Sequence, residues 1–466
     1  MEKSNLWILT EERPKREVIA QILRKFACDN RIPCFIDTIR ILPILNKERR
    51  FCFLYEVIGF RSNIIRKILL KIASGYSSFV DFLIFFQDDE PNETDIPLYA
   101  IEETKTDDSE SRNTGVFQRA SKFVYIDIYY PSVKKIMLFN LRVPQKKQPT
   151  DTYIFGTRCL LTLGVETLGK RLDGKIFKPF ASIDKLVKFK NNMNKPPKGN
   201  VPILISKEGN TIKISGRLIK DDSLSHDPNI GALSLICATL RKLGWTNSIV
   251  ITRHGLSRKH VKPENKFIKI ANVLRIDLEG LTLPQTQISN KYWKYETEGE
   301  KLGTIFIHLI VETFTSGDSI FENHAGCEKG YFITSNGTPV ALAKYSDRDA
   351  YKSGDKSKII SIPDLILIDF GRSEIINVEG KKYQFRDKGI EELKDFKDVE
   401  VRYIKKYYPS YKILRTVVLY GGTEKRVVEV EVGFLLNKNG DLVLGIKPPE
   451  IFKEAIKNLV DFWFAN

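Results

Sequence analysis

The 466-residue sequence lacks the patterns that several classes of protein require. It has no run of about 18 apolar residues, and its first residues contain no apolar signal core. The six cysteines show no CxxC spacing and the five histidines are dispersed, which argues against zinc fingers and a disulfide framework. Glycine-rich phosphate loops are also absent, which argues against nucleotide-driven translocation. These absences predict a cytoplasmic protein without a membrane segment.

Positive charge is what the sequence has in excess. Lysine and arginine number 74 against 58 acidic residues, a formal net charge of +16. Basic side chains near phosphates release condensed counterions and gain free energy by it, so nucleic acid is the expected partner. A general bias of composition toward lysine is the alternative explanation. With 42% hydrophobic residues, the chain is long enough for two or three globular domains.

One ten-residue phrase occurs twice in the chain. Residues 125–134 read YIDIYYPSVK and residues 403–412 read YIKKYYPSYK, so seven of ten positions are identical. Each copy is expected between a helix and a strand, after two earlier strands. Chance similarity in a chain rich in tyrosine and lysine is the alternative, but the phrase recurs together with a second feature.

That second feature is a Glu-x-Lys triplet before each phrase, itself preceded by an aspartate in apolar sequence. The aspartate lies 22 residues before the glutamate in the first half and 15 before it in the second. Two further triplets, starting at Glu264 and Glu392, lie in a polar stretch and a predicted helix and lack such an aspartate. The two sets are Asp81, Glu103 and Lys105, and Asp364, Glu379 and Lys381.

These residue types suit metal-dependent cleavage of a phosphodiester. An aspartate and a glutamate on adjacent strands can converge on one Mg²⁺ ion, which prefers oxygen ligands. A lysine two residues after the glutamate lies on the same face of the strand, where it can orient water or stabilise charge at phosphorus. The backbone carbonyl of Thr104 or Gly380 is a candidate further ligand. A surface ion pair between each glutamate and its lysine is the structural alternative.

On these motifs, both halves resemble the PD-(D/E)XK nuclease superfamily, most often met in type II restriction endonucleases. The second half has the full Pro363-Asp364 pair, whereas the first has Val80 in place of proline. The resemblance covers roughly residues 60 to 145 and 300 to 425. It implies an α/β fold with two restriction-endonuclease-like cores, each a central mixed β-sheet flanked by helices. It also implies Mg²⁺, double-stranded DNA, and a separately encoded cognate DNA methyltransferase.

Periodicity and turn residues give a coarse order of elements. A polar segment with a proline pair at 191–200 predicts a linker between an N-terminal domain, 1–190, and a C-terminal domain, 201–466. Helices are expected at 17–26, 63–70, 117–123, 231–243, 305–312 and 389–393. Strands are expected at 79–86, 98–103, 135–139, 364–368, 374–379 and 416–420.

Other side chains are candidates for contacts with DNA or metal. Glu312 and Glu322 are each candidates for an additional carboxylate of the second centre, or ordinary surface acids. The basic stretch 151–192 is a possible second surface facing DNA, and a solvated basic loop is the alternative for the segment 253–260. The candidate DNA-binding residues are Gln118, Arg119, Arg253, His254, Arg258 and Lys259.

Two centres in one chain predict a site-specific double-stranded DNA endonuclease in which each centre cuts one strand. Because the halves differ, the expected target is asymmetric. One alternative is a single active centre with a decayed copy, giving a nicking enzyme or a homodimeric nuclease. Another is a non-catalytic DNA-binding protein with nuclease-like folds. The sequence leaves open whether the protein is a monomer or a dimer.

Overall fold

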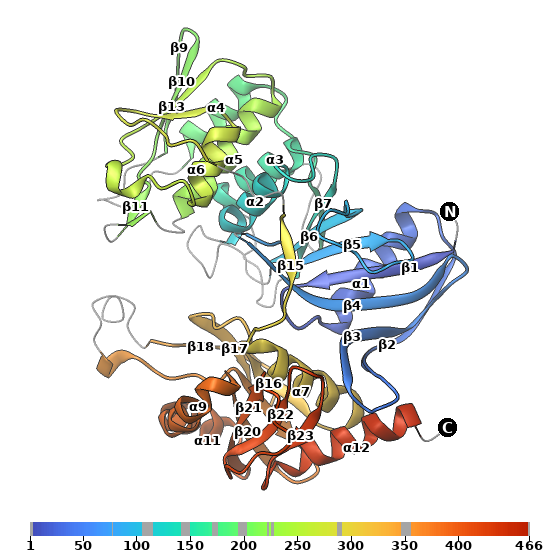
Figure 1. Cartoon of the computed structure of the whole chain (residues 1–466). Coiled ribbons are helices and arrows are strands. Elements are labelled where there is room, and N and C mark those ends of the chain that lie inside the picture. Colours follow the sequence, from blue (N-terminus) through green and yellow to red (C-terminus); the bar gives the residue numbers. More distant parts are fainter. Residues whose placement is uncertain are drawn as a thin grey trace. The chain divides into compact units, whose positions relative to one another are not determined.

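The computed structural model describes residues 3–76, 78–104, 115–140, 150–169, 176–193, 203–220, 223–224, 228–286, 291–345 and 356–464 (Figure 1). The chain forms two compact units, which we call unit 1 (Met1–Ala73, Gln87–Glu90 and Tyr295–Asn466) and unit 2 (Ser74–Phe86 and Pro91–Lys294). Each contains mixed strands and helices, which confirms the predicted α/β fold class. Within the described ranges, no helix is long and apolar enough to cross a membrane.

This division differs from the predicted domains 1–190 and 201–466. The segment 191–200 falls inside unit 2, and residues 194–200 lie outside the described part of the chain. The reason is a hydrophobic core that joins both sides of that segment. Phe155 and Leu186 from before it pack in one cluster with Ile212 and Leu233 from after it.

Unit 1 is assembled from both ends of the chain. The rings of Phe51 and Phe306 lie 5.0 Å apart between centroids. The Arg50 Nε donates to Asp441 Oδ1 at 2.8 Å, and the indole of Trp463 donates to a backbone carbonyl in the N-terminal part at 2.9 Å. Residues 4–73 therefore pack against residues 301–464 through buried aromatic rings and through hydrogen bonds between polar groups.

The sheet that carries the second motif lies in unit 1. Its strand order is β16-β19-β20-β21-β22-β23, with β19 and β20 antiparallel and β20, β21 and β22 parallel. Helices α7 and α9 both pack on β20 and β21. The elements of unit 1 are β1 (Ser4–Thr10), α1 (Arg16–Asp29), β2 (Cys34–Leu45), β3 (Phe51–Ser62), β4 (Ile65–Gly75), α7 (Lys301–Phe314), β16 (Asp318–Glu322), β17 (Lys329–Ile333), β18 (Pro339–Ala343), η2 (Lys356–Lys358), β19 (Leu365–Asp369), β20 (Glu374–Lys382), η3 (Tyr383–Phe385), α9 (Arg386–Glu392), η4 (Leu393–Phe396), α10 (Lys397–Val399), η5 (Glu400–Ile404), α11 (Lys405–Tyr407), β21 (Lys412–Tyr420), β22 (Val432–Leu436), β23 (Leu442–Leu444) and α12 (Glu450–Phe464).

Unit 2 repeats the same order of pairings. Strands β5 and β6 are antiparallel, and β6, β7 and β8 are parallel, with helix α2 between β6 and β7. The elements of unit 2 are β5 (Phe82–Phe86), β6 (Tyr99–Thr104), α2 (Gly115–Ile126), β7 (Lys134–Phe139), α3 (Asp151–Thr162), β8 (Glu166–Gly169), α4 (Ile183–Asn192), β9 (Ile205–Glu208), β10 (Thr211–Ser215), β11 (Ile219–Lys220), β12 (Ser223–Leu224), α5 (Pro228–Lys242), β13 (Ser248–Thr252), η1 (Arg258–His260), α6 (Lys266–Val273) and β14 (Ile276–Leu278); β15 (Trp293–Tyr295) crosses the boundary of the units.

The repeated phrase occupies the predicted slot in both units. The first copy runs from the end of α2 to the start of β7, and the second from η5 through α11 to the start of β21. Tyr130 and Tyr408, at equivalent positions, are both buried. The phrase therefore forms the connection from a helical segment to a parallel strand, and its equivalent tyrosines are buried there.

One predicted helix is a strand. The spacing of the apolar residues in 63–70 predicts a helix, but Ile65–Gly75 forms β4. Between Ile68 and Leu70 the strand is buried on both faces, so its apolar residues do not alternate with polar ones. Their spacing therefore resembles that of a helix.

Candidate functional site

The second motif forms an acidic centre in unit 1. Asp364 directly precedes β19, and Leu365 pairs with Val378, so Asp364 lies beside Glu379 on the neighbouring strand. The backbone N–H of Gly380 donates to Asp364 Oδ2 at 2.9 Å, which holds this carboxylate at the strand. The structure thus brings together the aspartate and glutamate that the sequence singled out.

Lys381 completes the set on the same face as Glu379. Its Nζ lies 2.5 Å from Glu379 Oε1 and 2.9 Å from Glu392 Oε2. Burial acts to lower the pKa of Lys381, but the two carboxylates outweigh burial and raise it above the usual value. The ion pair between Glu379 and Lys381, predicted as the structural alternative to a catalytic site, is therefore present. It does not explain why Asp364 lies beside Glu379.

Glu300 is an acidic residue near this centre that the sequence did not reveal. It directly precedes α7, its backbone oxygen borders Gly380, and its charge helps to raise the pKa of Asp364. The predicted additional acids are instead held by Arg13, at 2.8 Å from both Glu312 and Glu322. The helix was expected from residue 305, whereas it begins at Lys301, so the acid at its start was overlooked.

The acidic centre carries more negative than positive charge. Burial raises the pKa of Asp364 to about 6, and burial followed by the charge of Asp364 raises the pKa of Glu379 to about 8. Such crowding of carboxylates favours a bound cation, because a cation relieves the repulsion between them. The carboxylate oxygens of Asp364 and Glu379 are of the hard kind that Mg²⁺ prefers.

The first motif is arranged differently from the prediction. Phe82 pairs with Ile101, so Asp81 lies beside Glu102 and not Glu103. The N–H of Asp81 donates to Glu102 Oε2 at 3.2 Å, and the N–H of Glu103 donates to Asp81 Oδ2 at 2.6 Å. Because strand side chains alternate, Glu103 is on the other face, where it accepts from Asn140.

This register has a consequence for the lysine of the first motif. Glu102 corresponds to Glu379, and the residue two places further is Thr104, where unit 1 has Lys381. The carbonyl of Thr104, predicted as a metal ligand, accepts from the N–H of Asn140. Lys105 lies outside the described residues.

Two cations from α2 contact the acids of unit 2. Arg119 Nη1 lies 3.0 Å from Glu102 Oε1, and Lys122 Nζ lies 2.9 Å from Glu102 Oε2. Both also approach Asp81, at 3.8 and 3.7 Å. Arg119, predicted to bind DNA, therefore pairs with these acids, whereas the side chain of Gln118 lies outside the described part. We call this group the neutralised centre, since two cations contact its two acids.

Lys266, at the start of α6, is a third cation near the neutralised centre. Its Nζ donates to Ser78 Oγ at 2.8 Å and Ser121 Oγ at 3.0 Å. Burial, with a contribution from the charge of Lys122, lowers the pKa of Lys266 to about 7. In the sequence, Lys266 is marked only by a Glu-x-Lys triplet that lacks a preceding aspartate.

Lys266 predicts that unit 2 gains stability as the pH rises above 7. Between the folded pKa of about 7 and the unfolded value near 10.4, only the unfolded state holds the proton, so deprotonation favours folding. The free energy of unfolding of the wild type, minus that of Lys266→Met, should increase between pH 7 and 9.5, measured by urea denaturation. A difference that does not change with pH contradicts the assignment.

The basic segment 253–260 is only partly a surface. Arg253, Arg258 and Lys259 are exposed, as a DNA contact requires. His254 is buried: its Nε2 lies 2.8 Å from the carbonyl of Glu279, and its Nδ1 accepts from the N–H of Leu256. His254, predicted to contact DNA, therefore has its ring in the core, where it fastens the loop.

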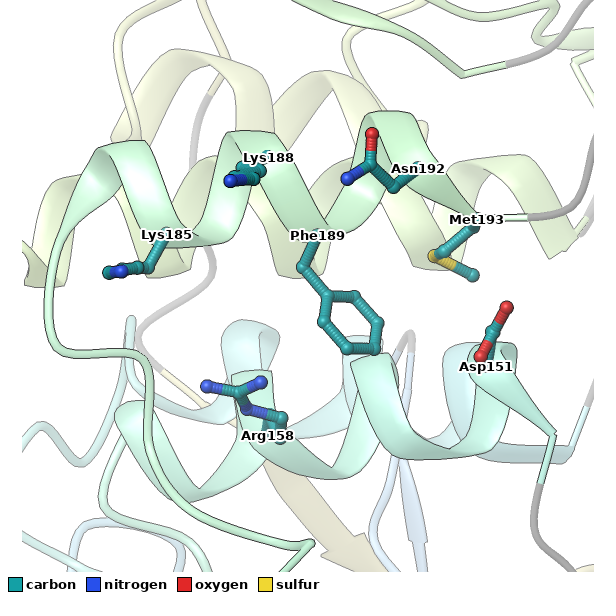
Figure 2. A pocket seen from close by; sticks show the side chains of 7 residues that line it. All are labelled: Asp151, Arg158, Lys185, Lys188, Phe189, Asn192 and Met193. Atoms are coloured by element: carbon teal, nitrogen blue, oxygen red, sulfur yellow. The ribbon is translucent and has the colours of Figure 1, made fainter.

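A basic pocket opens between α3 and α4 of unit 2 (Figure 2). Phe189 points from α4 toward α3, and the guanidinium of Arg158 lies 5.3 Å from its ring centre. The lysines of the predicted basic stretch 151–192 thus gather in part at one place. The pocket is lined by Asp151, Arg158, Lys185, Lys188, Phe189, Asn192 and Met193.

Comparison of the chain with protein-family models, with curated proteins and with solved structures finds no match. The resemblance to the PD-(D/E)XK nucleases therefore stays a prediction from the sequence motifs.

Proposed function

We propose that the protein is a magnesium-dependent, site-specific endonuclease of double-stranded DNA, of the type II restriction kind, with its active centre in unit 1. The observation that carries this proposal is the acidic centre. Asp364 and Glu379 lie side by side on antiparallel strands, and Lys381 contacts Glu379 at 2.5 Å. This is the residue set that hydrolysis of a phosphodiester with a divalent ion needs.

In this proposal Asp364 and Glu379 would hold the ion. Magnesium, when bound, would polarise the phosphoryl oxygen of the scissile bond and lower the pKa of a water molecule bound to it. Lys381 stabilises the negative charge that develops on the phosphoryl oxygens as water attacks phosphorus and the bond to the leaving oxygen breaks. Glu379 and Glu392 keep Lys381 protonated for that role, because both raise its pKa.

The neutralised centre supports one active centre per chain. Arg119 and Lys122 occupy the carboxylate oxygens of Glu102, and threonine stands where the lysine is needed. The missing lysine carries this preference, because Arg119 and Lys122 offset the acids only in part: burial and the charge of Asp81 still raise the pKa of Glu102 to about 7. We therefore favour the alternative of one centre with a decayed copy over two strand-specific centres. One chain then nicks one strand, and a double-strand break needs a second copy.

The net charge of +16 and the exposed Arg253, Arg258 and Lys259 support DNA as the partner. Under this proposal the enzyme acts in the cytoplasm, and a separately encoded methyltransferase protects the host DNA.

The proposal is tested with supercoiled plasmids of varied sequence. Wild-type protein with magnesium should convert them to open-circular and then to linear DNA with defined ends, and EDTA should prevent this. Asp364→Asn should abolish both steps, because it removes a charged ligand at a position buried against Gly380. Two results contradict the proposal: intact plasmid under all magnesium conditions, or nicking that persists in Asp364→Asn.

A further inference from the structure

Unit 1 contains a second cluster of metal-binding side chains, distinct from the acidic centre. His308 belongs to α7 and is fully buried, Glu322 ends β16, and His324 follows two residues later. One ligand atom from each of the three lies within 4.8 Å of the other two. Among the described residues this is a set of two imidazoles and one carboxylate, which suits transition-metal dications.

The two imidazoles face one another. His308 Nδ1 and His324 Nε2 are 3.0 Å apart. With metal–nitrogen bonds of about 2.1 Å, two nitrogens at that separation subtend about 90° at a metal ion. That is the angle between neighbouring ligands in a five- or six-coordinate site.

The second nitrogen of His324 has the partner that a ligand needs. Its Nδ1 lies 3.0 Å from Thr304 Oγ1, and that hydroxyl donates its proton to the carbonyl of Lys301 at 3.1 Å. The hydroxyl therefore accepts from His324 Nδ1–H, which leaves Nε2 unprotonated and directed at His308. Histidine ligands are commonly oriented by such a bond from the nitrogen that does not bind the metal.

Ion pairs fix the position of Glu322. Arg13 Nε and Lys15 Nζ contact its two oxygens at 2.8 and 2.7 Å, so a metal ion would bind Glu322 beside these two cations. Three cations are balanced by three carboxylates here. They are Arg13, Lys15 and Arg16, and Glu312, Glu322 and Asp318.

We propose that His308, Glu322 and His324 bind a transition-metal dication such as Zn²⁺. The site joins α7 to the segment after β16. Within that segment the N–H of Asn323 donates to the carbonyl of Asp364 at 2.7 Å, so the bound ion fixes the backbone at the acidic centre. The inference does not depend on the proposed nuclease activity, because binding of the ion is measured without DNA.

The test is calorimetric titration of metal-stripped, full-length protein with Zn²⁺, with excess magnesium present to occupy the acidic centre. Wild-type protein should bind one equivalent at micromolar or lower concentration and unfold at a higher temperature. His324→Gln, which retains hydrogen-bonding groups, should lose more than about 100-fold in affinity, since even loss of an outer-shell partner costs 10–100-fold.

Two control variants show where the ion binds. Asp364→Asn removes a ligand of the acidic centre, and His254→Gln replaces a buried histidine of unit 2. Both should bind Zn²⁺ like the wild type. The proposal is overturned if wild-type protein shows no saturable binding, in which case the two rings share a proton instead. It is equally overturned if His324→Gln binds as tightly as the wild type, or if Asp364→Asn loses the binding.

Discussion

Glu379→Gln is expected to slow DNA cleavage by about 10²–10³-fold or more, the cost of removing one charge-stabilising group from a preorganised centre. The glutamine keeps the size of the side chain but removes a negative charge beside Asp364 and weakens the pair with Lys381 at 2.5 Å. Nicking of supercoiled plasmid under single-turnover conditions, at saturating magnesium, measures the effect.

The matched control is Glu102→Gln, at the equivalent position of unit 2. It makes the same chemical change where Arg119 and Lys122 already satisfy the acid, so the nicking rate should stay close to that of the wild type. Circular dichroism must show that both variants are folded. If Glu102→Gln halts cleavage of one strand and Glu379→Gln cleavage of the other, both centres are active and the single-centre proposal fails.

Gly380→Ala is expected to reduce cleavage by about 10²-fold, the scale of loss that a misplacement of 1 Å produces. An added Cβ would lie 2.6 Å from Thr304 Cγ2 and 3.1 Å from Asp364 Oδ2. The first contact is closer than packed carbons tolerate, so α7 or the strand must move. Because Gly380 N–H also holds Asp364, the movement displaces the carboxylate.

Gly371→Ala is the control for that substitution. Gly371 lies between β19 and β20, and the nearest atom to its added Cβ is Asp369 Oδ1 at 3.5 Å, an ordinary contact. Gly371→Ala should cleave DNA like the wild type. Unchanged cleavage by Gly380→Ala would show that close packing around the acidic centre is not required.

Much of the fold was predictable where local patterns coincide with the tertiary structure. The apolar run 364–368 and the repeated phrase located β19 and β21, because short buried strands and tyrosine-rich corners are local signals. The composition of the units was not predictable. The contact of Phe51 with Phe306 joins residues far apart in the sequence, and nothing in either segment encodes the other.

The candidate site was predictable to the extent that it depends on spacing. Asp364, Glu379 and Lys381 follow a motif, and the structure brings them together. In the first half the sequence offers adjacent Glu102 and Glu103, and only the pairing of β5 with β6 decides between them. A shift of one residue moves a strand side chain to the opposite face, so a motif alone cannot make that choice.

The discontinuous make-up of unit 1 determines the order in which the chain can fold during synthesis. Unit 2 is complete in sequence once Lys294 has left the ribosome, and domains generally fold as they emerge. Residues 4–73 pack against α7, Asp441 and Trp463, all of which are made after unit 2. A nascent chain can therefore carry a folded unit 2 before the parts of unit 1 can come together.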